Sequence, residues 1–206
     1  MILDEFFTYR KDLLNLSKDE EGFIQESKLL SQILPSMLDA KLIESEDANG
    51  SYFKSNADKM KVNAYCVNES GERLQLFMIN ESSIDLSASN EDIQISLKSF
   101  YESQFKRGTN FVNKAIKGHL NDEIQDSNPA RALISKMSSS EGAEQFDVVE
   151  IFLISATATV SLKGTTPGPK RIDFDDEELA ITYSKHRERL AKKLLIKKKL
   201  IDLNFL

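Results

Sequence analysis

Few residues in this 206-residue sequence can bind a metal through sulfur or imidazole or act as a thiol nucleophile. The only cysteine is Cys66 and the only histidines are His119 and His186, which excludes a disulfide within the chain and leaves too few ligands for a Cys/His zinc site. Cys66 lies in an apolar run typical of a strand, which favours a buried thiol over a reactive one. We therefore predict no metal bound by cysteine or histidine.

A basic run near the end of the sequence is its clearest charge feature. Residues 1–105 contain 10 Lys or Arg and 19 Asp or Glu, residues 106–206 contain 17 and 14, and residues 185–199 alone hold eight of the basic residues. Clustered cations can bind phosphate groups even on an acidic protein. The candidate phosphate contacts are Lys185, Arg187, Arg189, Lys192 and Lys193. No aromatic residue is interleaved with them, so any binding would ignore base sequence.

Hydrophobic spacing predicts the elements that position these residues. Apolar residues three to four positions apart predict helices over residues 2–16, 19–39, 90–105, 110–120, 130–137 and 185–198. Alternating or continuous apolar runs predict strands over residues 42–46, 61–67, 73–79, 147–155, 172–174, 180–183 and 200–206. In the helix at 185–198, the alternative to phosphate binding is that the leucines dock on the core and the lysines face solvent.

Three local signals refine this order. Ser17 and Glu20 form a capping box that starts the second helix, which Pro35 should end or kink. Ser70 and Gly71 suit a tight turn between the strands at 61–67 and 73–79. The strand at 147–155 is apolar along nearly its whole length, which predicts burial on both faces.

The order helix, β-meander, helices and buried strand predicts an α/β (α+β) fold with a mixed sheet flanked by helices. It matches the core of restriction-endonuclease-like PD-(D/E)XK nucleases. We place this core at residues 1–160, followed by an extension at 161–206. Because the chain enters an apolar run and stops at Leu206, we expect it to be the start of a larger protein.

A nuclease of that type needs an acid on the second meander strand and an acid-x-Lys on the third, which together hold Mg²⁺ and activate water. With Ser70 and Gly71 as the turn, paired positions sum to 141, so Asn63 faces Met78 and shares its side of the sheet with Asn80. Neither carboxylate nor lysine then remains at these positions. Glu26 on the preceding helix could be a remnant acid of such a site, or a solvated helix residue.

Several segments resemble the N-terminal region of the abortive infection phage resistance (AIPR) family. Residues 59–65, KMKVNAY, and 74–80, LQLFMIN, are similar to the family pattern RGMKVDGY followed by LTLFISDF. Residues 100–105 resemble the family's helix end with paired aromatics, and residues 181–190 resemble its strand followed by WDIERL. Asn63, Asn80 and His186 stand where the family has Asp, and the resemblance implies a larger C-terminal region after this segment.

These features predict a non-catalytic recognition or scaffolding domain of a cytoplasmic, bacterial or phage-defence protein. Two alternatives remain: a metal-dependent nuclease that uses Mg²⁺, and a module that binds nucleic acid through residues 185–199. The absence of charge at Asn63, Met78 and Asn80 argues against catalysis and against any bound metal or cofactor. The expected partner is the rest of a larger protein, with nucleic acid or a second copy possible. The acidic N-terminus and the lack of a long apolar stretch argue against export and against a membrane.

Overall fold

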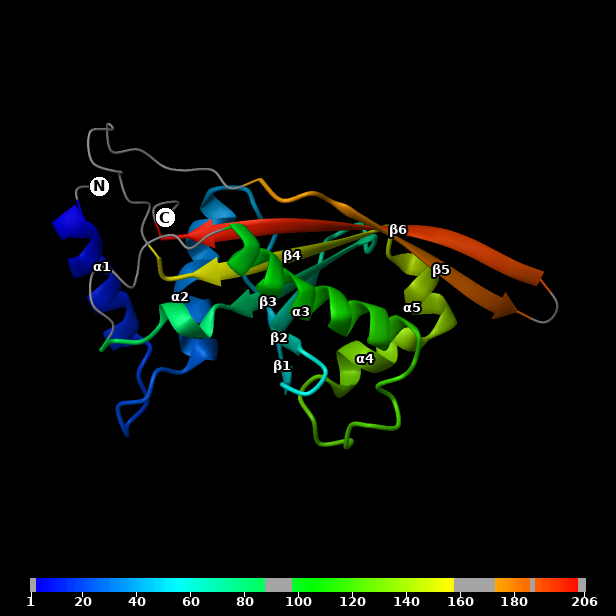
Figure 1. The fold of residues 1–206 in the computed structure, drawn as a ribbon, viewed down its shortest axis with the longest axis horizontal. Coiled ribbons are helices and arrows are strands. Elements are labelled where there is room, and N and C mark those ends of the chain that lie inside the picture. The colour runs from blue at the N-terminus through cyan, green and yellow to red at the C-terminus, as the bar shows by residue number, and fades with distance from the viewer. Residues whose placement is uncertain (1–2, 88–97, 158–172, 186–187, 204–206) are drawn as a thin grey trace.

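The computed structural model describes residues 3–87, 98–157, 173–185 and 188–203 (Figure 1). Its helices are α1 (Leu3–Leu16), α2 (Glu26–Asp39), α3 (Lys98–Ile116), α4 (Arg131–Ser138) and α5 (Ser140–Gln145), with one 3₁₀ turn at Glu81–Ser83. Its strands are β1 (Asn49–Ser55), β2 (Met60–Val67), β3 (Arg73–Ile79), β4 (Val148–Ser155), β5 (Glu177–Lys185) and β6 (Glu188–Asp202).

The strands form one mixed sheet in the order β1-β2-β3-β4-β6-β5. β3 pairs with β4 and β4 with β6 in parallel, whereas the β1–β2, β2–β3 and β5–β6 pairs are antiparallel. The parallel β3–β4 pair requires a long crossover, which α3, α4 and α5 supply. The predicted mixed sheet flanked by helices is confirmed.

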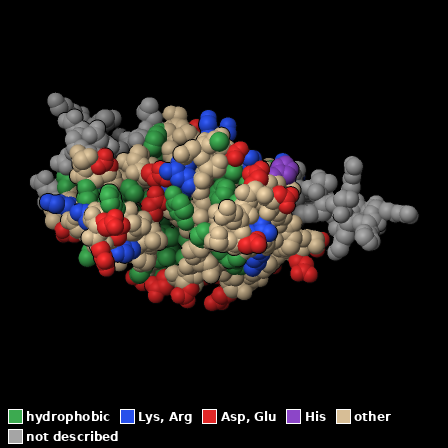
Figure 2. Space-filling model, turned by 90° about the horizontal axis from the view of Figure 1, so that it is seen from below, with side chains coloured by type: hydrophobic (Ala, Val, Ile, Leu, Met, Phe, Trp, Pro, Cys, Tyr) green, Lys and Arg blue, Asp and Glu red, His purple; other side chains and the backbone are tan. Residues whose placement is uncertain are grey.

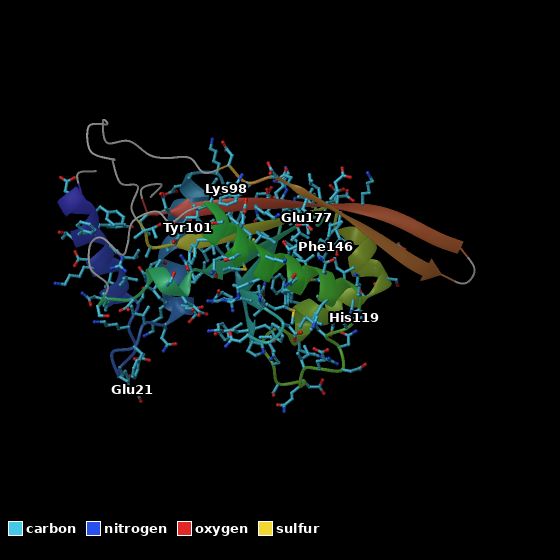
Figure 3. The ribbon with its side chains drawn as sticks, in the orientation of Figure 1. Glu21, Lys98, Tyr101, His119, Phe146 and Glu177 are labelled. Carbon is cyan, nitrogen blue, oxygen red and sulfur yellow. The ribbon has the colours of Figure 1, made fainter. Side chains whose placement is uncertain are left out.

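Helices cover the two faces of the sheet unequally. Large apolar residues of α3 and α4 pack on one face against even-numbered β3 residues such as Leu76, and α1 and α2 pack on the other against odd-numbered residues such as Phe77. Figure 3 shows Tyr101 on α3 and Phe146 before β4 on the first side, and both are buried. β4 lies between β3 and β6 with Val149 and Phe152 fully enclosed, which confirms its predicted burial on both faces.

The hairpin of β2 and β3 has the predicted register over its paired length. Ala64 pairs with Phe77 and Cys66 with Gln75, so the paired positions sum to 141. The Cys66 thiol is 4% exposed and donates a hydrogen bond to Gln75 Oε1 at 3.0 Å. Burial, together with the nearby Glu44 and Glu150, raises the pKa of Cys66 to about 11. This buried, protonated thiol agrees with the predicted unreactive cysteine.

The predicted helix over residues 185–198 is wrong, because β5 and β6 occupy this segment. Residues 148–155 pair with 195–202 on one edge of β6, and β5 pairs with its other edge. Leucines and lysines in this run satisfy both a helical and an alternating period, so tertiary pairing decides the structure. Leu194 and Ile196 enter the core on the α3 side, while Ile201 and Leu203 enter it on the α2 side. The apolar end at 200–203 is thus covered by the domain.

The second helix begins later than predicted. Ser17 does not cap it: its Oγ donates to Leu13 O at 2.8 Å. The carboxylate of Asp19 instead accepts the backbone N–H groups of Glu21 and Phe23, which holds residues 19–23 in a turn. Pro35 lies inside α2 without ending it.

The edge strand is β1 at 49–55 rather than residues 42–46. The predicted helices at 90–105 and 110–120 form one helix, α3, as far as it is described, and residues 90–97 lie outside the described residues. Strands are confirmed at 180–183 within β5, but residues 173–174 are not in a strand and residue 172 is not described.

Candidate functional site

A cluster of charged side chains lies at the junction of α2, β2 and the end of β3. Glu26 is the first residue of α2, Lys61 and Asn63 come from β2, and Glu81 begins the 3₁₀ turn that follows β3. The strand period places Lys61 and Asn63 on one face, two residues apart, toward the start of α2. The fold therefore brings two carboxylates, a lysine and an amide together from three separate segments.

Lys61 is the centre of this cluster. Its Nζ donates to Glu26 Oε1 at 2.8 Å, to Glu81 Oε1 at 2.8 Å and to the carbonyl oxygen of Ile79 at 2.9 Å. The side chain is 3% exposed, compared with 16% for Glu26 and 35% for Glu81. All three ammonium protons thus have an acceptor, as a buried lysine requires.

The remaining oxygens of the cluster also accept hydrogen bonds. Asn63 Nδ2 donates to Glu26 Oε2, and Asn63 Oδ1 accepts the backbone N–H of Ile79 at 2.8 Å. Lys54 on β1 donates to Glu81 Oε2 at 2.8 Å. Each carboxylate oxygen of Glu26 and Glu81 therefore accepts from a protein cation or amide.

Charged and aromatic groups surround the opening of the cluster. Burial alone would raise the pKa of Glu81, but hydrogen bonds from Lys54 and Lys61 and their charges hold it at about 2. Burial and the charge of Glu26 raise the pKa of the Tyr52 phenol, which is 46% exposed on β1. A cavity of about 470 Å³ between α2 and β1 is lined in part by Asn63.

The predicted site residues separate into two groups. Glu26, for which a remnant acid and a solvated helix residue were the two alternatives, is bound to Lys61 and Asn63 and is only 16% exposed. Met78 lies on the opposite face, in the core under α3. Asn80 is 2% exposed and binds the Ser155 and Ser82 hydroxyls at 2.9 Å.

The prediction that Asn63 shares a face with Met78 is wrong because alternation along β2 is interrupted. The register with β1 shifts between Gly50 and Phe53, so two β1 residues lie opposite Asn63. Asn63 and Ala64 both face α2 although they are neighbours in sequence, and the pairs of β2 with β3 begin only at Ala64.

Sequence reasoning missed Lys54, Lys61 and Glu81. A signal for Lys61 was present, because it precedes Asn63 by two residues in a strand and must share its face. Glu81 follows the end of β3, where strand alternation no longer predicts direction, and Lys54 lies on a strand that was placed elsewhere.

A second charged cluster lies on the same face of the sheet, at the other end of β3. Glu150 of β4 is 1% exposed and accepts hydrogen bonds from Lys199 Nζ at 2.7 Å and Gln75 Nε2 at 2.8 Å, with Arg73 Nη1 at 3.6 Å. Burial alone would raise the pKa of Glu150, but the hydrogen bonds from Lys199 and Gln75 lower it. The residues of this cluster tie β3, β4 and β6 together.

The predicted phosphate contacts in the basic run lie on strands, not on a helix. Lys185 ends β5, and Arg189, Lys192 and Lys193 belong to β6. Lys193 Nζ is 2.7 Å from Glu178 Oε2, with both side chains largely exposed. Arg187 lies outside the described residues.

Metal-binding side chains do not gather anywhere in the described part of the chain. No group of three or more His, Cys, Asp or Glu residues there could hold a metal ion. His119 follows α3 and lies at the far end of that helix from Tyr101 and Lys98 (Figure 3). Of the helices in the described ranges, none has the length and apolar character needed to cross a membrane.

A comparison with protein families shows the family to which the chain belongs. Residues 31–181 match the N-terminal domain of abortive infection phage resistance proteins. The chain belongs to this family. The match includes Lys54, Lys61, Asn63 and Glu81, and it begins inside α2, after Glu26.

The AIPR match confirms the resemblance seen in the sequence and identifies the chain as a domain of a phage-defence protein. No curated protein and no solved structure matches the chain. The role of the Lys61 cluster in this AIPR domain therefore has to be argued from its geometry.

Proposed function

We propose that this AIPR domain is a non-catalytic recognition or scaffolding domain with a degenerate restriction-endonuclease-like core. The order α2, β1, β2, β3, α3, β4 supports such a core. Glu26, Asn63 and Glu81 gather in it around Lys61, whereas Met78, at the predicted acid position, lies on the opposite face. In this proposal the Lys61 ammonium takes the place of the divalent cation.

The saturated carboxylates are the observation that carries the proposal. Mg²⁺ requires several oxygen ligands in near-octahedral geometry at about 2.1 Å. Here the ammonium of Lys61 lies within 2.9 Å of the oxygens of Glu26, Glu81 and Ile79. A metal ion could enter only if Lys61 left, and Asn63 would then supply a neutral oxygen where the family has an acid.

A metal-dependent nuclease is the second candidate, because the cluster contains the residue types of such a site. Glu26 and Glu81 could bind Mg²⁺ if Lys61 moved to activate water. Glu81 is 35% exposed, so it could reorient toward solvent. This candidate needs the three hydrogen bonds of a 3% exposed lysine to break first.

The deciding experiment measures cleavage and metal binding together. The purified chain is incubated with plasmid, single-stranded DNA and RNA in 10 mM Mg²⁺ or Mn²⁺ (concentrations on the order of those that saturate typical sites), and Mn²⁺ is titrated by calorimetry. We expect no cleavage and no heat of binding.

Two variants identify the source of any activity that is seen. Metal-dependent cleavage that is lost in both Glu26→Gln and Glu81→Gln, but kept in the exposed α3 control Glu102→Gln, would establish the nuclease and refute the proposal. Cleavage that is unchanged in all three variants would indicate a contaminant or another site. Asn63→Ala tests the remaining ligand in the same assay.

A further inference from the structure

None of the described helices covers one end of the sheet on the α2 face. In Figure 1, α1 and α2 lie at the end toward which β4 and β6 point, and neither reaches the opposite end. The side chains at that opposite end on this face are long and polar rather than aliphatic. Arg73 is 41% exposed, Lys199 33% and Lys193 75%.

Register places four cations on this uncovered part of the sheet. Ile201 enters the core on the α2 side, so Lys199, Lys197 and Lys193, which lie two, four and eight residues before it on β6, are on the same face. Lys197 pairs in register with Glu150, and Arg73 lies beside them on β3. We name these residues the basic face: Arg73, Lys193, Lys197 and Lys199.

The acidic residues near the basic face do not neutralise the positive charge that it presents to solvent. Glu150 is 1% exposed and lies beneath Lys199 and Arg73. Glu178 pairs with Lys193, but both side chains are more than 60% exposed, and such surface pairs exchange readily for other partners. Within the described residues Lys197 has no ion pair. The acid at the border is Glu44, whose carboxylate accepts the backbone N–H of Glu69.

We propose that the basic face binds the phosphate backbone of a nucleic acid without reading bases. Lysine heads on one face of an extended strand can contact several phosphates, and among the residues that the structure describes no exposed aromatic side chain on this face offers a platform for base stacking. Acidic side chains gather along the lower edge of the surface in Figure 2, and a nucleic acid would be repelled from that edge.

The test is a fluorescence anisotropy titration of the intact chain with labelled single-stranded DNA, duplex DNA and RNA at several salt concentrations. Four phosphate contacts at about 0.7 each predict a slope of roughly −2.8 for log K against log salt with single strands. That slope corresponds to a loss of about 50-fold in affinity between 50 and 200 mM salt.

Two matched double variants locate the binding surface. The double variant Lys193→Gln with Lys197→Gln removes two cations that do not pair with a buried carboxylate, so the protein should still fold. With two phosphate contacts left, the slope should become shallower, at about −1.4. Lys106→Gln with Lys117→Gln changes the charge equally on and next to α3, and it should leave the slope unchanged.

Three outcomes would overturn the proposal. The first is no binding at about 20 mM salt, where counterion release favours binding most. The second is an equal decrease of the slope in the α3 control variant. The third is binding of poly-glutamate with the same slope, which would show that the surface binds any polyanion. None depends on cleavage, so the result is independent of whether the Lys61 cluster is catalytic.

Discussion

The two charged clusters on the α2 face of the sheet bury opposite members of their ion pairs. At the end of β3 the cation is enclosed: Lys61 is 3% exposed, and its partners Glu26 and Glu81 reach solvent. At the start of β3 the anion is enclosed: Glu150 is 1% exposed, and its partners Lys199 and Arg73 reach solvent. The exposed member of a broken pair can hydrate, whereas the enclosed member cannot.

This difference also separates what the clusters can do. Around Lys61, the ammonium group lies between the two carboxylates and pairs with both. The negative charges of Glu26 and Glu81 are therefore already neutralised and are not offered to a cationic ligand. Around Glu150 the cations lie on the solvent side, where a polyanion can reach them. One cluster is therefore closed, and the other presents its charge to the surface.

The largest effect is expected when Lys61 loses both carboxylates. The double variant Glu26→Gln with Glu81→Gln keeps the side-chain shapes but leaves an enclosed ammonium beside neutral groups. Breaking such a pair costs about 3 to 5 kcal/mol of unfolding free energy. Urea denaturation at pH 7 measures it, with Glu20→Gln plus Glu21→Gln on an exposed turn as the control. An equal loss in the control would show that Lys61 is not enclosed.

A smaller loss is expected when Glu150 loses one of its cations. Lys199→Met leaves the buried carboxylate with Gln75 and the more distant Arg73, at a cost of about 1 to 3 kcal/mol. The neighbouring Lys198→Met is the matched control, because Lys198 pairs with the 41% exposed Glu177 on the other face of the same strand. If both variants lost the same stability, the enclosure of Glu150 would not matter.

The free energy of unfolding should depend on pH through both clusters, and both should make the protein less stable as the pH falls. The pKa of Glu81 is held at about 2 and that of Glu150 is lowered, both from an ordinary value of 4.5. A lowered carboxyl pKa contributes stability that is present above pH 4.5 and lost as pH falls toward the folded value. We expect stability to fall between about pH 4.5 and 2 in a series of urea titrations. Glu81→Gln should flatten this fall, and an unchanged profile would contradict the lowered pKa.

The sequence predicted one hairpin accurately because its turn fixes the pairing. Ser70 and Gly71 define the register, and Cys66 opposite Gln75 follows from it by counting. The same counting failed at Asn63, which lies outside the paired positions of β2 and β3 and faces α2 together with its neighbour Ala64. No local residue pattern announces that two adjacent residues of this strand face the same helix, since the turn specifies only the positions that pair.

The basic run shows the other limit of sequence reasoning. Leu194, Ile196 and the lysines around them fit a helix or a strand equally well. Their strand form depends on pairing with Val148–Ser155, a segment far away in the chain. The prediction that this run meets phosphates stays a proposal, now on the face of a strand. Of the five predicted contacts it keeps Lys193 alone, and it adds Arg73, Lys197 and Lys199.

The smallest effect is expected at the rim of the Lys61 cluster. Lys54 pairs with Glu81 at 2.8 Å, but the side chains are 29% and 35% exposed, so solvent screens the pair and each partner can hydrate. Lys54→Gln should cost less than about 1 kcal/mol of unfolding free energy in urea at pH 7. Because Lys61 still holds Glu81, the variant should keep the low pKa of Glu81 in part, and its acid unfolding should lie between those of the unmodified chain and Glu81→Gln. A cost as large as that of Lys199→Met would mean that Lys54 belongs to the enclosed part of the cluster, and the contrast between a closed and an open cluster would then have to be redrawn.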